Sequence, residues 1–115
     1  MQTPEARAEL SEALARLNKK FSESLPKRIL ALENDLAESR RTGYAAESLG
    51  KLYRAAHSLA GAAGTFGRPQ LSAVAQVLAE YLNRHADGGA EFRSAEVDQI
   101  DALTASVIKV ANADR

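Results

Sequence analysis

His57 stands among unusually small neighbours in the stretch LGKLYRAAHSLAGAAGTFG, residues 49–67. If this stretch is projected as a helix at about 100° per residue, its leucines fall on one side. His57 lies away from them, with Gly50, Gly61 and Gly64 around it. Because each glycine inside a helix costs roughly 1 kcal/mol relative to alanine, we infer that another molecule must approach this face closely. A neutral imidazole is a good nucleophile near physiological pH, so attack on an activated phosphoryl group is the chemistry that His57 could perform.

Positive charge accompanies this histidine. Residues 48–79 contain Lys51, Arg54 and Arg68 and no acidic residue. Cations of this kind stabilise a bound phosphoryl group. The sequence supplies no second catalytic group beside His57, neither a Ser/His/Asp set nor a carboxylate pair nor a glycine-rich loop after a strand. These residues therefore predict a phosphocarrier that another protein's active site serves, and not an enzyme.

Composition excludes several other classes of function. Lys and Arg together number 15 and so do Asp and Glu, which removes the overall charge that non-specific binding to nucleic acids or anionic membranes needs. With no Cys and two His, the chain has no disulfide and no thiolate zinc site, and we expect no metal or cofactor. No apolar run approaches the roughly 20 residues of a spanning helix, and the N-terminus MQTPEARAEL is charged. We expect a cytoplasmic protein.

The helices that must position His57 are predicted from apolar periodicity. Ala and Leu, the strongest apolar helix formers, number 23 and 14 of the 115 residues, which favours an all-α domain. The first helix is predicted to begin at Thr3-Pro4-Glu5 and to stop at Thr42-Gly43, bent at Pro26. One apolar stripe is predicted to be buried along it: Leu10, Leu14, Leu17, Phe21, Leu25, Ile29, Leu32 and Leu36.

Three further amphipathic helices are predicted. The second runs from Tyr44 to Phe66, the third opens at Pro69 and ends at Asp87-Gly88-Gly89, and the last starts near Ser94. The residues expected to face inward are Ala45, Leu49, Leu52, Ala56, Leu59, Ala63 and Phe66, then Leu71, Val74, Leu78 and Leu82, then Val97, Ile100, Leu103, Val107 and Ala111. Short connections imply antiparallel neighbours. We predict one domain over residues 1–115, an up-and-down four-helix bundle with an additional N-terminal helical segment.

The stretch AAHSLAGAAGTFG, residues 55–67, resembles the phosphorylation motif of bacterial histidine phosphotransfer domains. His57, Leu59, Gly61 and the Phe66-Gly67 pair recur at the family's spacing. LYRAAHSL with AGTFG is most similar to the version at the N-terminus of chemotaxis histidine kinases, and a looser resemblance runs from Phe21 to the Leu78–Leu82 region.

The resemblance implies a four-helix bundle in which His57 is phosphorylated and exchanges its phosphoryl group with the aspartate of a response-regulator receiver domain, whose bound Mg²⁺ does the catalysis. A histidine kinase or hybrid kinase is the other expected partner. The family usually carries Lys three residues after the histidine, and this chain has Ala60 there. Chemotaxis kinases carry Glu on the next helix, at a position that aligns with Ala79 of this chain. Gln76 and Glu80 are candidates to orient the imidazole instead.

The predicted site therefore combines three groups of residues. His57 is the phosphoacceptor, and Ala60, Gly61 and Gly64 form the docking surface. The supporting residues are Lys51, Arg54, Arg68, Gln76 and Glu80. The other histidine, His85, is interpreted as a partner of a helix C-terminus.

Two alternatives from other classes stay open. One is a degenerate docking module that binds a receiver or kinase without carrying phosphate, for which the missing Lys and Glu would be the signature. The other is a helical dimerisation module whose glycine face is its interface. For the carrier we expect a monomer.

Overall fold

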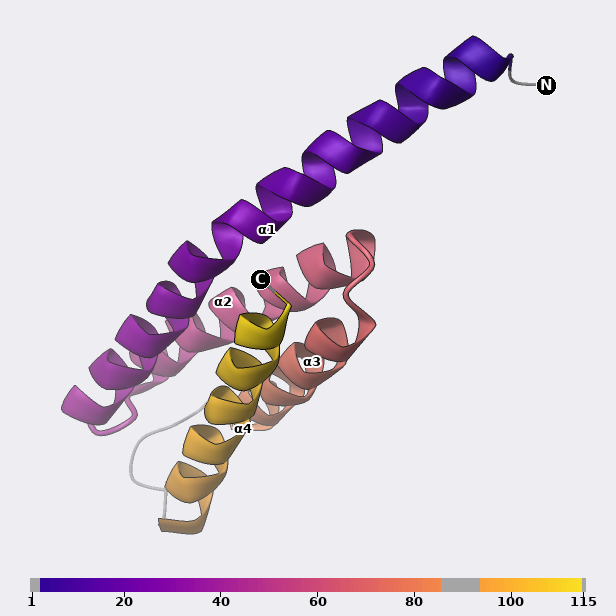
Figure 1. Ribbon diagram of the computed structural model, residues 1–115. Helices are drawn as coiled ribbons and strands as arrows, with labels where there is room; N and C mark the ends of the chain where they lie inside the picture. The colour runs from indigo at the N-terminus through magenta and orange to yellow at the C-terminus, as the bar shows by residue number, and fades with distance from the viewer. Residues whose placement is uncertain (1–2, 86–93, 115) are drawn as a thin grey trace.

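The computed structural model describes residues 3–85 and 94–114, which form four α-helices (Figure 1). They are α1 (Pro4–Arg41), α2 (Ala46–Thr65), α3 (Pro69–Arg84) and α4 (Ser94–Ala113). Helix α2 packs against α1 and α3, and α4 packs against the same two helices. Consecutive helices run in opposite directions, which confirms the predicted all-α, up-and-down bundle (Figure 1). No helix in the described residues combines the length and hydrophobicity that crossing a membrane requires.

The helix ends follow local sequence signals. The Thr3 hydroxyl oxygen accepts a hydrogen bond of 3.1 Å from the Ala6 amide and caps α1. After α1 the chain turns through two residues with positive φ, Gly43 at 66° and Tyr44 at 62°. Gly67, with φ of 71°, ends the α2 region and precedes the Pro69 that opens α3. The predicted stop at Asp87-Gly88-Gly89 lies outside the described residues.

The bundle core consists of leucine, alanine and other apolar side chains from all four helices. Most residues that were predicted to face inward are buried, including Leu52, Leu59 and Leu78. Ala75 and Thr104, which were not predicted, are buried. The predicted residues that are only partly buried are Ala45, Phe66, Val74, Val97 and Leu103. Apolar periodicity therefore predicted the buried face of each helix, but it did not predict the burial of every residue at the edge of that face.

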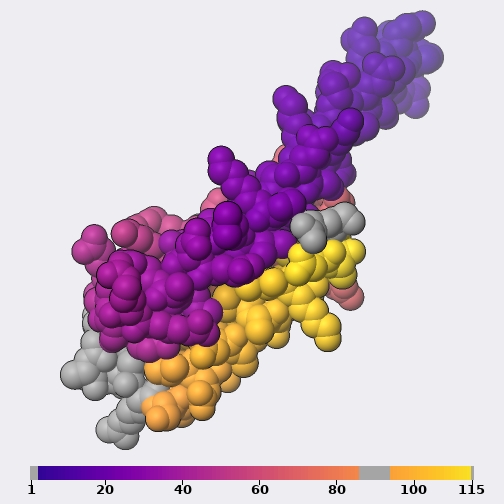
Figure 2. All heavy atoms as spheres, turned by 60° about the vertical axis from the view of Figure 1, so that its left-hand side comes forward, coloured from indigo at the N-terminus to yellow at the C-terminus, as the bar shows by residue number. Residues whose placement is uncertain are grey.

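The N-terminal half of α1 corrects one expectation. Leu10, Leu14 and Leu17, predicted to be buried, are 48%, 54% and 46% exposed, and burial begins at Phe21. With 38 residues, α1 is about 57 Å long, whereas the 20 residues of α2 span about 30 Å. The N-terminal turns of α1 therefore project beyond the other helices, and within residues 3–85 and 94–114 no other helix packs against them (Figure 2).

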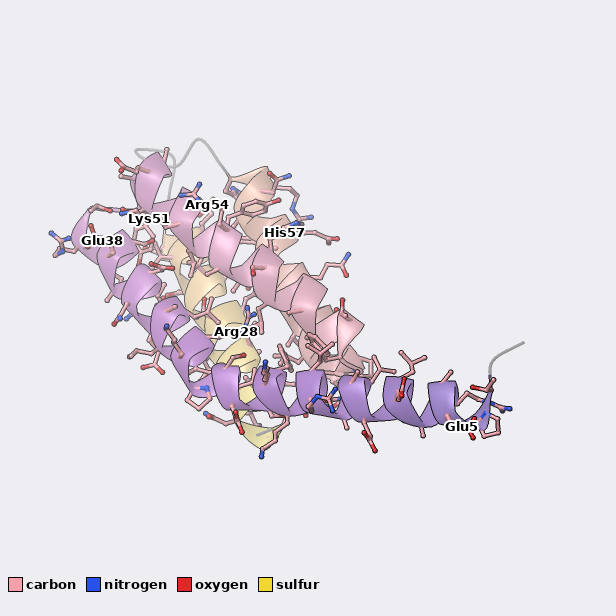
Figure 3. The ribbon with its side chains drawn as sticks, turned by 90° about the horizontal axis from the view of Figure 1, so that it is seen from above. Glu5, Arg28, Glu38, Lys51, Arg54 and His57 are labelled. Atoms are coloured by element: carbon pink, nitrogen blue, oxygen red, sulfur yellow. The ribbon has the colours of Figure 1, made fainter. Side chains whose placement is uncertain are left out.

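The predicted bend in α1 is confirmed. Pro26 lies inside the helix, which continues through it without interruption, so the additional N-terminal segment is the first half of α1. Figure 3 shows the helix axis changing direction midway along α1. A proline inside a helix removes one backbone hydrogen bond and displaces the preceding turn, which accounts for the bend.

Thr104 provides a test of core energetics. Its side chain is 1% exposed, and its hydroxyl oxygen has no hydrogen-bond partner within residues 3–85 and 94–114. Because burying an unpaired hydroxyl is unfavourable, we expect Thr104→Val to raise the free energy of unfolding by about 1 kcal/mol in urea titrations. The control is Thr65→Val, since the exposed Thr65 hydroxyl donates to the Gly61 carbonyl, and we expect little change there. A lower stability of Thr104→Val would show that the hydroxyl has a partner after all.

Candidate functional site

His57 lies on the outer face of α2. Its side chain is exposed, while Leu52, Ala56 and Leu59 on the opposite face of the same helix are buried in the core. Among the described residues, no hydrogen bond or ion pair involves the imidazole. Lys51, Arg54 and His57 follow one another along α2 in Figure 3. The ring is therefore reachable from solvent, as its position outside the leucine stripe predicts.

A groove of about 670 Å³ runs beside His57 between α2 and α3. Small side chains form much of it, so its surface is smooth close to the imidazole. Five of the predicted site residues line the groove together with His57: Ala60, Gly61, Gly64, Gln76 and Glu80. Tyr53, Thr65, Ser72, Ala79 and Asn83 complete the lining. The structure thus brings the predicted docking residues and the histidine to one surface.

Gly61 and Gly64, which both line the groove, have different structural roles. A Cβ atom added to Gly61 would meet no atom within 4 Å, so Gly61 leaves open space next to the histidine. A Cβ atom added to Gly64 would lie 3.2 Å from the Ser72 hydroxyl, which itself donates a hydrogen bond of 2.8 Å to the Ala60 carbonyl. Gly64 therefore allows α3 to approach α2 closely, while Gly61 keeps the groove open.

Gln76 and Glu80 form the polar side of the groove. The Gln76 amide donates to the Glu80 carboxylate over 3.2 Å, so the two side chains, one turn apart on α3, bind each other. Within the described residues, neither forms a hydrogen bond with His57. Ala60 and Ala79 line the groove beside His57, so methyl groups stand at the two positions where the resemblance leads to the expectation of Lys or Glu.

Lys51 and Arg54 are exposed on α2, one to two turns before His57, but neither lines the groove. A guanidinium nitrogen of Arg54 lies 3.5 Å from where a Cβ atom of Gly50 would be, so this side chain reaches back along α2, away from His57. Burial raises the pKa of the Asp35 carboxyl on α1, and the charges of Lys51 and then Arg54 oppose that rise. Asp35, which is distant in sequence, is therefore close enough to Lys51 and Arg54 to interact with their charges.

Arg68 is held by α1. Its guanidinium donates to the Ser22 hydroxyl over 2.6 Å and to the Phe66 carbonyl over 3.4 Å, and lies 5.8 Å from the centre of the Phe21 ring. It is not among the residues that line the groove. The side chain ties the turn between α2 and α3 to α1, and this setting separates it from the other predicted supporting residues.

Tyr53 is a site residue that the sequence interpretation missed. Its ring stacks on the His57 imidazole, with the ring centres 5.6 Å apart and the planes 18° from parallel. The signal was present in the sequence, because residues four apart lie one above the other on a helix. The described residues contain no group of His, Cys, Asp or Glu that could hold a metal ion.

Comparison with known proteins agrees with this geometry. A family model described as the Hpt domain matches residues 4–112, nearly the whole chain. No curated protein and no solved structure gives a significant match. The match spans all four helices and the groove, and Hpt domains are the histidine phosphotransfer modules of two-component signalling. The chain belongs to the Hpt domain family.

Proposed function

We propose that this Hpt domain carries a phosphoryl group on His57 and exchanges it with the aspartate of a response-regulator receiver domain. One observation carries the proposal: His57 is exposed at the edge of a groove that, on the side away from the Tyr53 ring, is lined by small residues such as Ala60 and Gly61. A receiver active site is concave, and its aspartyl phosphate can reach an imidazole only where the surrounding surface does not obstruct it. The groove provides that access.

The transfer step makes few demands on this chain. The unprotonated ring nitrogen of His57 attacks phosphorus, so that a P–N bond forms as the P–O bond to the aspartate breaks and the carboxylate leaves. The proton on the other ring nitrogen can then pass to water. The receiver and its Mg²⁺ stabilise the charge that develops on the phosphoryl oxygens. This chain presents the nucleophile and acts as a phosphocarrier, not as an enzyme.

The supporting residues take unequal parts in this proposal. Lys51 and Arg54 are exposed on the same helix as His57, and Arg54 can stabilise the phosphoryl group by swinging from Gly50 toward the histidine. Gln76 and Glu80 provide polar contacts for the receiver from the α3 side of the groove. Arg68 is held by its hydrogen bonds to Ser22 and to the Phe66 carbonyl, which leaves stabilisation of the phosphoryl group to Lys51 and Arg54.

A second candidate is a docking module that binds a receiver or kinase without carrying phosphate. The observation that favours it is that Ala60 and Ala79 put methyl groups where relatives place charged side chains beside the histidine. His57 would then be a contact residue of the interface. The same groove serves both candidates, so only chemistry distinguishes them.

The test is to incubate the chain with receiver domains of the source organism that have been phosphorylated with radiolabelled acetyl phosphate. We expect label on this chain that is labile in acid and stable in alkali, as a phosphorus–nitrogen bond is. Calorimetric binding of a receiver without transfer of label would support the docking module. If no receiver binds and the chain sediments as a dimer, the helical dimerisation module is the correct interpretation.

A further inference from the structure

The Tyr53 ring stacks on the His57 imidazole. The two residues are one helical turn apart on α2, and their rings stack with centres 5.6 Å apart and planes 18° from parallel. Both line the groove between α2 and α3. The Tyr53 ring therefore forms the wall of the groove next to the nucleophile.

The two rings differ in how firmly they are held. Tyr53 is half-buried and packs against the hydrophobic core, and a second, smaller cavity of about 70 Å³ places it beside Leu82 and Asn83 of α3. His57 is exposed and takes part in no hydrogen bond within the described part of the chain. The exposed imidazole is thus stacked on a ring that is partly buried and packed against the core.

We propose that Tyr53 is a positioning residue for phosphoryl transfer, whose stacked ring restricts the rotation of the His57 imidazole. The proposal rests on the function proposed for His57. Attack on phosphorus requires the nucleophilic nitrogen to lie in line with the breaking bond, so a freely rotating ring is in the reactive orientation only part of the time. Stacked aromatic pairs favour one arrangement by roughly threefold to tenfold.

The test compares Tyr53→Leu with Tyr53→Phe, which keeps the ring and removes only the hydroxyl. In Tyr53→Leu we expect the rate of transfer at saturating receiver to fall by roughly fivefold to tenfold, with the half-saturating receiver concentration changed less than twofold. The ring-current shift of the His57 carbon-bound protons in NMR spectra should disappear. Tyr53→Phe should keep both the rate and the shift.

The chain contains a matched control. Tyr81 on α3 and His85, the residue that follows α3, form a second pair four residues apart, with ring centres 4.6 Å apart. Neither residue lines the groove, so Tyr81→Leu should leave the transfer rate unchanged. Circular dichroism of all variants establishes that each is folded.

The remaining outcomes overturn the inference. A wild-type rate in Tyr53→Leu, or a loss of receiver affinity at an unchanged saturated rate, would show that the ring has no positioning role. A ring-current shift that persists in Tyr53→Leu would show that the stack does not form in solution. If the wild-type chain accepts no label at all, the proposed function fails first and this inference fails with it.

Discussion

Replacing His57 by glutamine is expected to abolish the acid-labile label completely, while affinity for the receiver changes by less than about threefold. Glutamine has no nucleophilic nitrogen at physiological pH, so no P–N bond can form. It is polar and of similar size, and it is a better helix former than histidine. Because position 57 is exposed, we expect the free energy of unfolding to stay within about 0.5 kcal/mol of the wild type. The measurement is label transfer together with calorimetric affinity.

His85→Gln provides the matched control, since the sequence contains two histidines. His85 follows α3 and packs against the Tyr81 ring away from the groove. We expect full labelling of His85→Gln. Label that survives in His57→Gln and is lost in His85→Gln would move the phosphoacceptor to the end of α3 and contradict the proposed function.

The fold could be predicted from the sequence almost completely, because each helix carries its own periodic and end signals. Thr3, Gly43 and Pro69 mark helix boundaries through local backbone chemistry, and the structure confirms all three. Burial of Leu14 could not be predicted in the same way. Periodicity shows which face of a helix is apolar, but whether a partner helix extends that far depends on the lengths of the other elements.

The site was predictable to the extent that it lies on one helix. The spacing of His57, Gly61 and Gly64 along α2 indicates a shared face, and the groove lined by all three confirms this. Contacts between elements could not be predicted. Asp35 interacts with Lys51 and Arg54, and Arg68 forms a hydrogen bond with α1. Both contacts depend on how α1 packs against α2, and the sequence of residues 49–67 alone does not predict that packing.

Substitutions at position 61 can change how accessible His57 is without lowering the stability of the bundle, and two variants test this. An added Cβ atom would meet nothing within 4 Å, so an alanine methyl group at position 61 fits the bundle. Gly61→Ala should raise the free energy of unfolding by about 0.5–1 kcal/mol, because alanine loses less conformational entropy in a helix. Its single methyl group should alter transfer by less than about threefold.

Gly61→Leu should be at least as stable as the wild type and yet lose about 10- to 100-fold in transfer at subsaturating receiver. The leucine side chain would occupy the groove one turn after His57, where the receiver packs under the proposed function, and such steric conflict costs about 1–3 kcal/mol. Ala31→Leu adds a similar side chain at an exposed position of α1 and should transfer normally. Single-turnover kinetics and urea titration measure the two effects. A Gly61→Leu variant that transfers at the wild-type rate would mean that the receiver does not dock on this groove, because the added side chain would obstruct a receiver that packs there.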